Sequence, residues 1–155
     1  MMPAYKQPRS VLVVIHTLAG EVLLLERARH PGFWQSVTGS RENGESARTT
    51  AWREVREETG LDFPPMALQD WHIENTFSLH PAWRHRYAPD VTHNCERVFA
   101  LPLPERLPVR LAPEEHRAYA WLPWQEAAAR CFSWSNRDAI LLLEKQLQTQ
   151  RTQST

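Results

Sequence analysis

The sequence predicts a single domain of the α/β or α+β class. Its length of 155 residues suits one domain. Apolar runs of strand length alternate with segments whose apolar residues follow helical spacing, and this mixture is typical of strands packed against helices. The chain has no internal repeat or low-complexity tract. We therefore expect one domain over residues 1–148, followed by a frayed polar tail over 149–155.

The N-terminal part predicts three strands. The first is the β-branched run Val11–Leu18, which is too short for a helix and continuous enough to be buried. Ala19-Gly20 forms a turn, and Glu21–Glu26 reads as the hairpin partner. A third strand over Phe33–Thr38 is expected to run directly into Gly39.

A helix follows. Ser46 is a typical N-cap for a helix that starts near Ala47. Ala47, Ala51 and Val55 recur every four residues and predict a buried stripe. Gly60 stands where a left-handed C-terminal cap would end the helix.

The second half of the chain predicts three further strands, a long loop and two helices. Ser135 is the expected cap of the last helix, whose residues Ala139, Ile140, Leu142 and Leu143 would face the core. The expected elements are strands over 68–77, 96–103 and 118–122, a loop over 79–93, and helices over 124–129 and 136–148.

The charge and cysteine content of the chain indicate which kinds of binding partner to expect. The 18 basic and 18 acidic side chains cancel, so bulk charge gives no reason to expect nucleic-acid or membrane binding. Cys95 and Cys131 form no CxxC pair, which favours a reducing compartment. No apolar run has the length of a signal core or a membrane span. We expect a cytoplasmic protein with a small-molecule partner, either a monomer or a weak homo-oligomer.

Three carboxylates crowd one face of the first predicted helix. Glu54, Glu57 and Glu58 stand at i, i+3 and i+4, a spacing at which like charges destabilise a helix by roughly 0.2–0.5 kcal/mol per pair. A bound cation would remove that repulsion. Ligands that are all oxygen favour a hard divalent ion such as Mg²⁺, which commonly shares its coordination with substrate phosphates. The alternative is a solvated acidic face.

The segment around these carboxylates, Gly39–Leu61, resembles the signature sequence of the Nudix family, the Nudix box. Its fixed positions are Gly39, Glu45, Arg53-Glu54, apolar Val55, Glu57-Glu58, Gly60 and apolar Leu61, with no gap in the spacing. So many fixed positions make the match far more specific than a lone glycine motif. The resemblance implies an α/β/α sandwich with a mixed β-sheet. It also implies Mg²⁺-dependent hydrolysis of a nucleoside diphosphate linked to another group, or of a close analogue.

The metal ligands follow in part from spacing and in part from the resemblance. Glu54 and Glu58, one turn apart, are the first choices for direct ligands, with Glu57 as a third ligand or as their hydrogen-bonding partner. The resemblance adds the backbone carbonyl of Gly39 as another metal ligand. It also implies that Glu45 binds a second metal ion through a water molecule. Mn²⁺ is a possible substitute for Mg²⁺.

The general base stays open. In some Nudix enzymes the glutamate at the Glu54 position takes the proton from water, and in others a carboxylate from a distant loop does so. Glu114 and Glu115 are the candidates from a loop, and we favour Glu115 as the base or as a further metal ligand. The alternative is that both are exposed loop carboxylates without a catalytic role. Glu54, Glu57 and Glu115 are thus the predicted catalytic residues. Arg53 is expected to pair with a carboxylate of the box rather than with phosphate.

Other segments resemble one branch of the family, the bacterial dihydroneopterin triphosphate pyrophosphatases. These are Phe33–Ser40, Arg84–Pro89 and Ser133–Ile140, with Tyr5–Pro8 and Val91–Asn94 extending the match. The resemblance implies that 7,8-dihydroneopterin 3′-triphosphate is cleaved to the monophosphate and pyrophosphate in folate synthesis. The alternatives are a Nudix enzyme for nucleoside triphosphates such as dATP or oxidised purine nucleotides, and a catalytically silent binding module.

The candidate substrate residues match a flat ring with a polyphosphate tail. For Trp34 and Trp134, packing in the core is favoured over stacking on a ligand ring. Arg27 could bind phosphate or could simply be a solvated residue at the end of a strand. Arg84 and Arg86 alternate with His85, so a strand-like conformation would point both the same way. The candidates are Lys6, Arg27, Arg84 and Arg86 for phosphate, Trp34, Trp83, Tyr87 and Trp134 for ring faces, Ser133, Ser135 and Asn136 for ring edges, and Thr38 beside the box.

Overall fold

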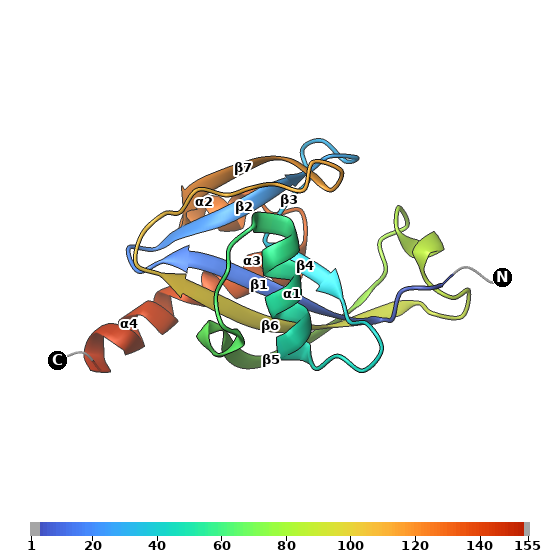
Figure 1. Cartoon of the computed structure of the whole chain (residues 1–155), viewed down its shortest axis with the longest axis horizontal. Helices are drawn as coiled ribbons and strands as arrows, with labels where there is room; N and C mark the ends of the chain where they lie inside the picture. The colour runs from blue at the N-terminus through green and yellow to red at the C-terminus, as the bar shows by residue number, and fades with distance from the viewer. Residues whose placement is uncertain (1–3, 154–155) are drawn as a thin grey trace.

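The chain folds into one sheet between two helical layers. The structure is a computed structural model that describes residues 4–153. Helix α1 (Ala47–Thr59) crosses one face of the sheet, and the C-terminal helices lie behind it (Figure 1). These are α2 (Trp124–Arg130), α3 (Trp134–Leu141) and α4 (Leu143–Gln153). The predicted α/β/α sandwich is confirmed.

The seven strands form a mixed sheet. Its main order is β3-β2-β1-β6-β5, with β4 paired to β1 and β7 paired to β2. Among the strand pairs of the described residues, β1 and β6 run parallel and the other pairs are antiparallel. The strands are β1 (Arg9–Thr17), β2 (Glu21–Arg27), β3 (Trp34–Gln35), β4 (Val37–Ser40), β5 (Gln69–Ser78), β6 (His93–Leu103) and β7 (His116–Pro123).

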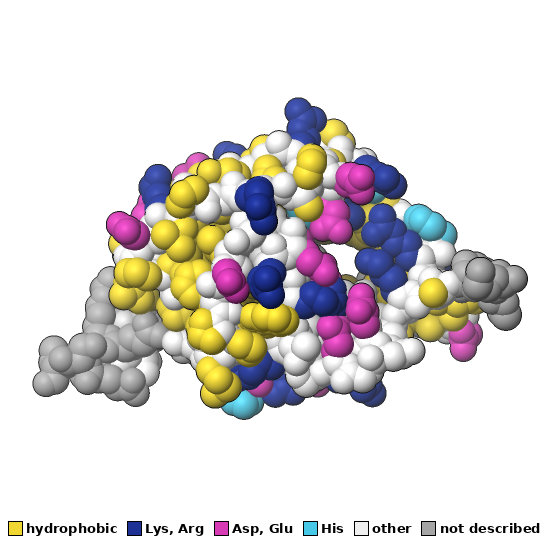
Figure 2. Space-filling model, viewed as in Figure 1, with side chains coloured by type: hydrophobic (Ala, Val, Ile, Leu, Met, Phe, Trp, Pro, Cys, Tyr) yellow, Lys and Arg dark blue, Asp and Glu magenta, His cyan; other side chains and the backbone are white. Residues whose placement is uncertain are grey.

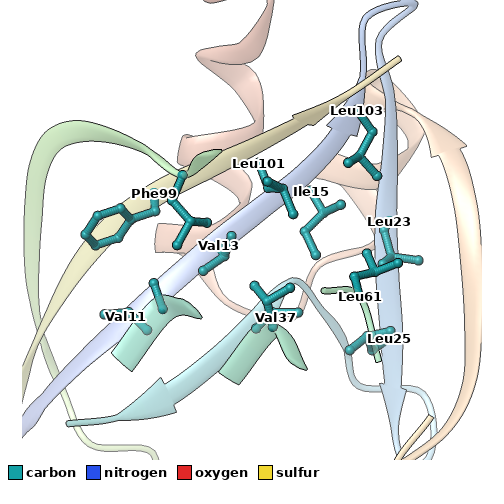
Figure 3. Close-up of a cluster of buried hydrophobic side chains, with 13 residues drawn as sticks. Val11, Val13, Ile15, Leu23, Leu25, Val37, Leu61, Phe99, Leu101 and Leu103 are labelled. Atoms are coloured by element: carbon teal, nitrogen blue, oxygen red, sulfur yellow. The ribbon is translucent and has the colours of Figure 1, made fainter. Parts of the chain in front are cut away.

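Both faces of the sheet are buried, which explains the continuous apolar runs in the sequence. Val11, Val13 and Ile15 of β1 join the core under α1, together with residues of β2, β4 and β6 (Figure 3). Leu12 and Val14, which alternate with them, join a second core against the C-terminal helices. Among the residues described, no helix combines the length and apolarity needed to cross a membrane.

Helix α1 has the predicted boundaries and caps. Ser46 accepts a hydrogen bond from the Thr49 N–H, and Gly60 adopts a left-handed conformation with φ of 72°. Ala51 and Val55 are buried in the core, as their spacing predicts. Because these two residues fix the rotation of α1, they also decide which way its carboxylates point.

The strand predicted over Phe33–Thr38 is two strands. β3 pairs with β2 and β4 pairs with β1, and Ser36 separates them. The Ser36 N–H donates to Asn136 Oδ1 at 2.8 Å, so it cannot take part in a strand ladder. A long-range side-chain contact therefore breaks the predicted strand.

The predicted cap of the last helix was wrong. Ser133, not Ser135, accepts the hydrogen bond from the Asn136 N–H, and the helix begins at Trp134. The predicted single helix is also divided at Leu142, where α3 ends and α4 begins. Helical structure continues to Gln153, beyond the expected end near Gln148. The fraying of 149–155 stays a prediction, and its last two residues lie outside those described.

Candidate functional site

A large cavity opens beside α1, at the end of the sheet where β4 runs into the box. It has a volume of about 870 Å³. In the space-filling view, acidic and basic side chains face each other across a hollow to the right of centre (Figure 2). Of the candidate residues named from the sequence, those that line the cavity are Lys6, Arg27, Thr38, Gly39, Glu54, Glu58, Trp83, Arg86, Tyr87, Glu114, Glu115, Ser133, Trp134, Ser135 and Asn136.

Glu54 and Glu58 form the acidic end of the cavity. Their carboxyl groups lie close enough that each shifts the pKa of the other, and Glu58 is only 2% exposed. Burial raises the pKa of Glu54 to about 7, against the opposing charge of Arg53. Burial and the neighbouring Glu54 raise the pKa of Glu58 well above its ordinary value. Glu58 Oε2 is buried without a hydrogen-bond partner, so the pair has an unused ligand atom.

Gly39 allows Glu54 to occupy this position. A Cβ added to Gly39 would lie 2.1 Å from Glu54 Cδ and 2.2 Å from its Oε1. No side chain can stand there without displacing the carboxylate. The glycine of the box therefore keeps the backbone of β4 and the Glu54 carboxylate in direct contact.

Arg53 links the remaining carboxylates of the box. Its guanidinium donates to both oxygens of Glu45, at 2.7 and 2.9 Å, and to Glu54 Oε1 at 2.9 Å. It also donates to the Ser40 carbonyl at 3.2 Å, which connects α1 to the end of β4. The expectation that Arg53 pairs with a box carboxylate is confirmed.

Glu57 and Glu45 lie on the Arg53 side of the helix. Glu57 is not among the residues lining the cavity; its side chain is 53% exposed and contacts Arg53 at 3.2 Å. Hydrogen bonds from Arg53 lower the pKa of Glu45 to about 2. Both oxygens of Glu45 are used by that contact, so the geometry gives Glu45 a positioning role.

His116 also belongs to the site, although no pattern in the sequence indicated that it would lie there. One ligand atom each of Glu58, Glu115 and His116 lies within 4.8 Å of the other two, so this group could hold a metal ion. Burial and the nearby Arg27 lower the pKa of His116 to about 4. The 3.6 Å contact between His116 and Glu58 is therefore not an ion pair at neutral pH.

Three cations gather at the opposite side of the cavity. Lys6, Arg27 and Arg86 come from the N-terminal segment, the end of β2 and the loop between β5 and β6. Burial lowers the pKa of Lys6 and of Arg27, and Arg86 lowers both further. Arg27 is held over the ring of Trp83 at 4.7 Å. Mutually repelling cations on one wall are suited to a polyanion.

Arg84 does not join them. Residues Arg84–Arg86 form a short 3-10 helix, so the strand-like alternation considered from the sequence is wrong here. Arg84 is exposed and does not line the cavity, whereas Arg86 is half-buried and does. Residues two apart in such a helix point in different directions.

The four candidate aromatic residues divide into two groups. Trp83, Tyr87 and Trp134 line the cavity. Trp134 is 45% exposed, so the favoured reading of it as a core anchor was wrong. Trp34 packs against the core beneath the C-terminal helices, with Arg130 over its ring.

A polar group on the cavity floor was not foreseen from the sequence. Glu96 and Asn94 lie on β6, are 5% and 4% exposed, and line the cavity. Burial raises the pKa of Glu96 to about 7. Ser135 donates to Glu96 Oε1 at 2.8 Å. The signal available in the sequence was that Asn94 and Glu96 are polar residues at alternate positions at the start of an otherwise apolar strand.

Comparison with known protein families supports the Nudix resemblance of the sequence. The family described as NUDIX domain matches residues 6–143. The chain belongs to the NUDIX family. Its curated relatives include the dihydroneopterin triphosphate diphosphatase of Escherichia coli K12, which is 47% identical over 88% of this chain and 91% of that protein. The enzyme of the same name from Haemophilus influenzae is 39% identical over 90% and 89%.

Solved NUDIX structures share the fold. The E. coli dihydroneopterin triphosphate pyrophosphohydrolase superposes with a TM-score of 0.83 at 46% identity, over 89% of this chain and 95% of that one. A putative NUDIX hydrolase from Listeria monocytogenes has a TM-score of 0.77 at 23% identity, over 93% and 97%, a likeness of fold alone.

Proposed function

We propose that this NUDIX protein hydrolyses 7,8-dihydroneopterin 3′-triphosphate to dihydroneopterin monophosphate and pyrophosphate. The observation that carries the proposal is the 47% identity to a diphosphatase of that name over nearly the whole length of both chains. The cavity supports it independently, because carboxylates, cations and exposed aromatic rings all line one space. Those are the groups that a metal ion, a triphosphate tail and a flat ring require.

The carboxylates fit a divalent metal ion, and we propose Mg²⁺, with Mn²⁺ as a possible substitute. The unpartnered Glu58 Oε2 is a free oxygen ligand in a buried position, and Glu54 lies beside it. Glu54, Glu58 and the Gly39 carbonyl would hold the ion, and Glu115 offers a carboxylate oxygen within 4.8 Å of a ligand atom of Glu58. When bound, the ion would neutralise charge on the phosphoryl oxygens and orient the leaving group.

The cations would hold the tail. Lys6, Arg27 and Arg86 all line the cavity, and they lie close enough that Arg86 lowers the pKa of both Lys6 and Arg27. Arginine can bind phosphate oxygens through two parallel hydrogen bonds, which fixes orientation as well as position. The tail would then bridge the cations and the carboxylates, with a phosphorus atom at the acidic end.

We assign the proton transfer to Glu115. Its carboxylate is exposed and belongs to the group that also contains Glu58 and His116. Glu54 already accepts a hydrogen bond from Arg53 at 2.9 Å and lies beside Glu58. In the reaction, the water oxygen would bond to phosphorus, and the bond from that phosphorus to the bridging oxygen would break. The bridging oxygen would leave with the electron pair as part of the departing phosphate group, and Glu115 would accept the water proton. Glu57 would act through Arg53 rather than on the substrate.

Nucleoside triphosphates such as dATP are the second candidate, since a purine is also a flat fused ring. Comparing kcat/KM for the pteridine triphosphate and for dATP separates the two. We expect the pteridine compound to be preferred, and a preference for dATP of more than about tenfold, roughly 1.4 kcal/mol, would reject the proposed substrate. A silent binding module would release no pyrophosphate from either.

Cellular location and assembly remain proposals. The two cysteines are free, as expected of a protein from the cytoplasm. A monomer or a weak homo-oligomer is proposed for its assembly.

A further inference from the structure

The cavity floor contains a small polar surface that phosphate chemistry does not use. Glu96 and Asn94 come from β6, Ser10 from the paired strand β1, and Ser135 from the start of α3. All four are at most 6% exposed and all line the cavity. The carboxylates of α1 belong to a different element, so the floor is available for another part of the ligand.

Two hydrogen-bond acceptors on this floor, one on Glu96 and one on Asn94, have no partner in the part of the chain that the structure describes. Glu96 Oε1 accepts from Ser135, while the structure gives its second oxygen, Oε2, no hydrogen bond among the described residues. Asn94 donates to Ser10 Oγ at 2.7 Å, but its carbonyl oxygen Oδ1 is buried without a partner. The unused atoms are therefore acceptors. A buried acceptor left unpaired costs free energy, so a ligand that brings N–H donors is favoured.

Asn136 is not part of this polar surface on the cavity floor, because both groups of its side-chain amide are already hydrogen-bonded. Its amide accepts from the Ser36 N–H at 2.8 Å and donates to Ser36 Oγ at 2.9 Å. Both ends of that amide are satisfied inside the protein. Ser133 likewise accepts from the Asn136 N–H and contacts Ser135 Oγ at 3.0 Å. Ser135, which also contacts Ser133, is the residue of this group that holds Glu96, and Glu96 is the group left to contact a ligand.

Aromatic rings flank the same place. Trp134, the residue before Ser135, is half exposed and meets Phe77 in a T-shaped arrangement at 6.3 Å. Both rings line the cavity. A flat ligand ring packed against Trp134 could direct one edge towards Glu96. Such a combination of one apolar face and a few polar groups is typical of heterocycle recognition.

We propose that Glu96 and Asn94 select ligand rings whose edge carries a ring N–H beside an amino group. A carboxylate can accept both hydrogens in parallel, and the Asn94 carbonyl can accept a further one. The 2-amino-4-oxo edge of a pteridine has this pattern, as does guanine. Adenine presents a ring nitrogen acceptor there, which a carboxylate repels. The proposal rests on the proposed function for its substrate, and it makes Glu96 a specificity residue of that site.

The raised pKa of Glu96 is consistent with this role. Burial makes the ionised carboxylate unfavourable, and a single hydroxyl donor offsets this only in part. Two N–H donors from a ligand would stabilise the charged form.

The test compares substrates in Glu96→Gln, which keeps the shape of the side chain and replaces one acceptor with a donor. We expect the ratio of kcat/KM for dGTP to that for dATP to fall about 10- to 100-fold, mainly through KM for dGTP, because a bidentate contact discriminates by roughly 1–3 kcal/mol. The value for dihydroneopterin triphosphate should fall with that for dGTP. Glu74→Gln, an exposed change on the neighbouring strand β5, is the matched control.

Two further measurements make every outcome decisive. An equal loss for all three substrates, or no loss, would overturn the proposal and leave Glu96 structural. If the wild-type chain hydrolyses none of them, the proposed function fails, and binding of unphosphorylated dihydroneopterin, followed by tryptophan fluorescence, tests Glu96 alone. Weaker binding in the variant would then support the proposal, and equal binding would reject it. Asn94→Ala provides the same comparisons if Glu96→Gln does not fold.

Discussion

Gly39 and Glu54 are in contact so close that the glycine hydrogen occupies the only space available: a Cβ there would lie 2.1 Å from Glu54 Cδ. We therefore predict that Gly39→Ala displaces the Glu54 carboxylate and lowers kcat/KM by about a hundredfold, the effect of a misplacement near 1 Å. Steady-state pyrophosphate release measures it.

The matched control for that change is Gly32→Ala. Gly32 has a φ of +87° and no atom within 4 Å of an added Cβ. This variant should lose stability, by about 1–2 kcal/mol, because an alanine is strained in that backbone conformation. Its activity should be retained. A similar activity loss in both variants would contradict the Gly39 assignment.

Arg53→Lys tests whether the arginine positions the metal carboxylates. Lysine cannot reproduce the bidentate contact with Glu45 while also reaching Glu54. Apparent Mg²⁺ affinity should fall about 10- to 100-fold, as is common when a partner of a metal ligand is changed. The Mg²⁺ dependence of initial rates gives the value. Arg56→Lys, on the same helix with a 3.8 Å contact to Asp62, should behave as wild type; an equal effect would remove the role of Arg53.

The two arginines of the 3-10 helix separate phosphate binding from general surface charge. Arg86→Gln should raise KM for the triphosphate by about 10- to 100-fold, because charge-assisted hydrogen bonds contribute roughly 1.5–3 kcal/mol. Arg84→Gln removes the same charge two residues away but outside the cavity lining, and it should leave KM unchanged. Equal shifts in both would mean that long-range charge, not contact, binds the tail.

Glu96 also predicts a pH dependence of stability. Its pKa in the folded protein is raised to about 7 from an ordinary value of 4.5. The folded state therefore binds the proton more tightly, so this stabilising contribution is complete below pH 4.5 and is lost as the pH rises through 7. Relative to Glu96→Gln, the wild-type chain should lose up to about 3 kcal/mol between pH 4.5 and pH 8. Urea unfolding in metal-free buffer measures the difference, and parallel pH profiles would contradict it.

Much of the fold and half of the site were accessible from the sequence because they depend on local spacing. Glu54 and Glu58 are one helical turn apart, and Ser46 and Gly60 set the ends of that helix. Strand pairing is not local. The parallel pairing of β1 with β6 places Ser10 opposite Glu96, and no short-range pattern predicts it.

The remaining errors have the same origin. The division of Phe33–Thr38 into two strands depends on Asn136, a hundred residues later in the chain. His116 precedes an ordinary strand in the sequence, and only folding brings it to Glu58. Arg84 and Arg86 were grouped by alternation, which failed because their loop forms a 3-10 turn.

The central claim is that Glu58 holds the divalent ion required for hydrolysis. Its most direct test is pyrophosphate release from dihydroneopterin triphosphate against Mg²⁺ concentration, for the wild-type chain, Glu58→Gln and the exposed control Glu126→Gln. We predict saturable Mg²⁺ dependence in the wild type and control, and a loss of more than about a hundredfold in Glu58→Gln. That variant should be as stable as the wild type or more stable without metal, since a buried carboxyl group with one unpartnered oxygen has been replaced by a neutral amide. An unchanged rate and Mg²⁺ dependence in a folded Glu58→Gln would contradict the account.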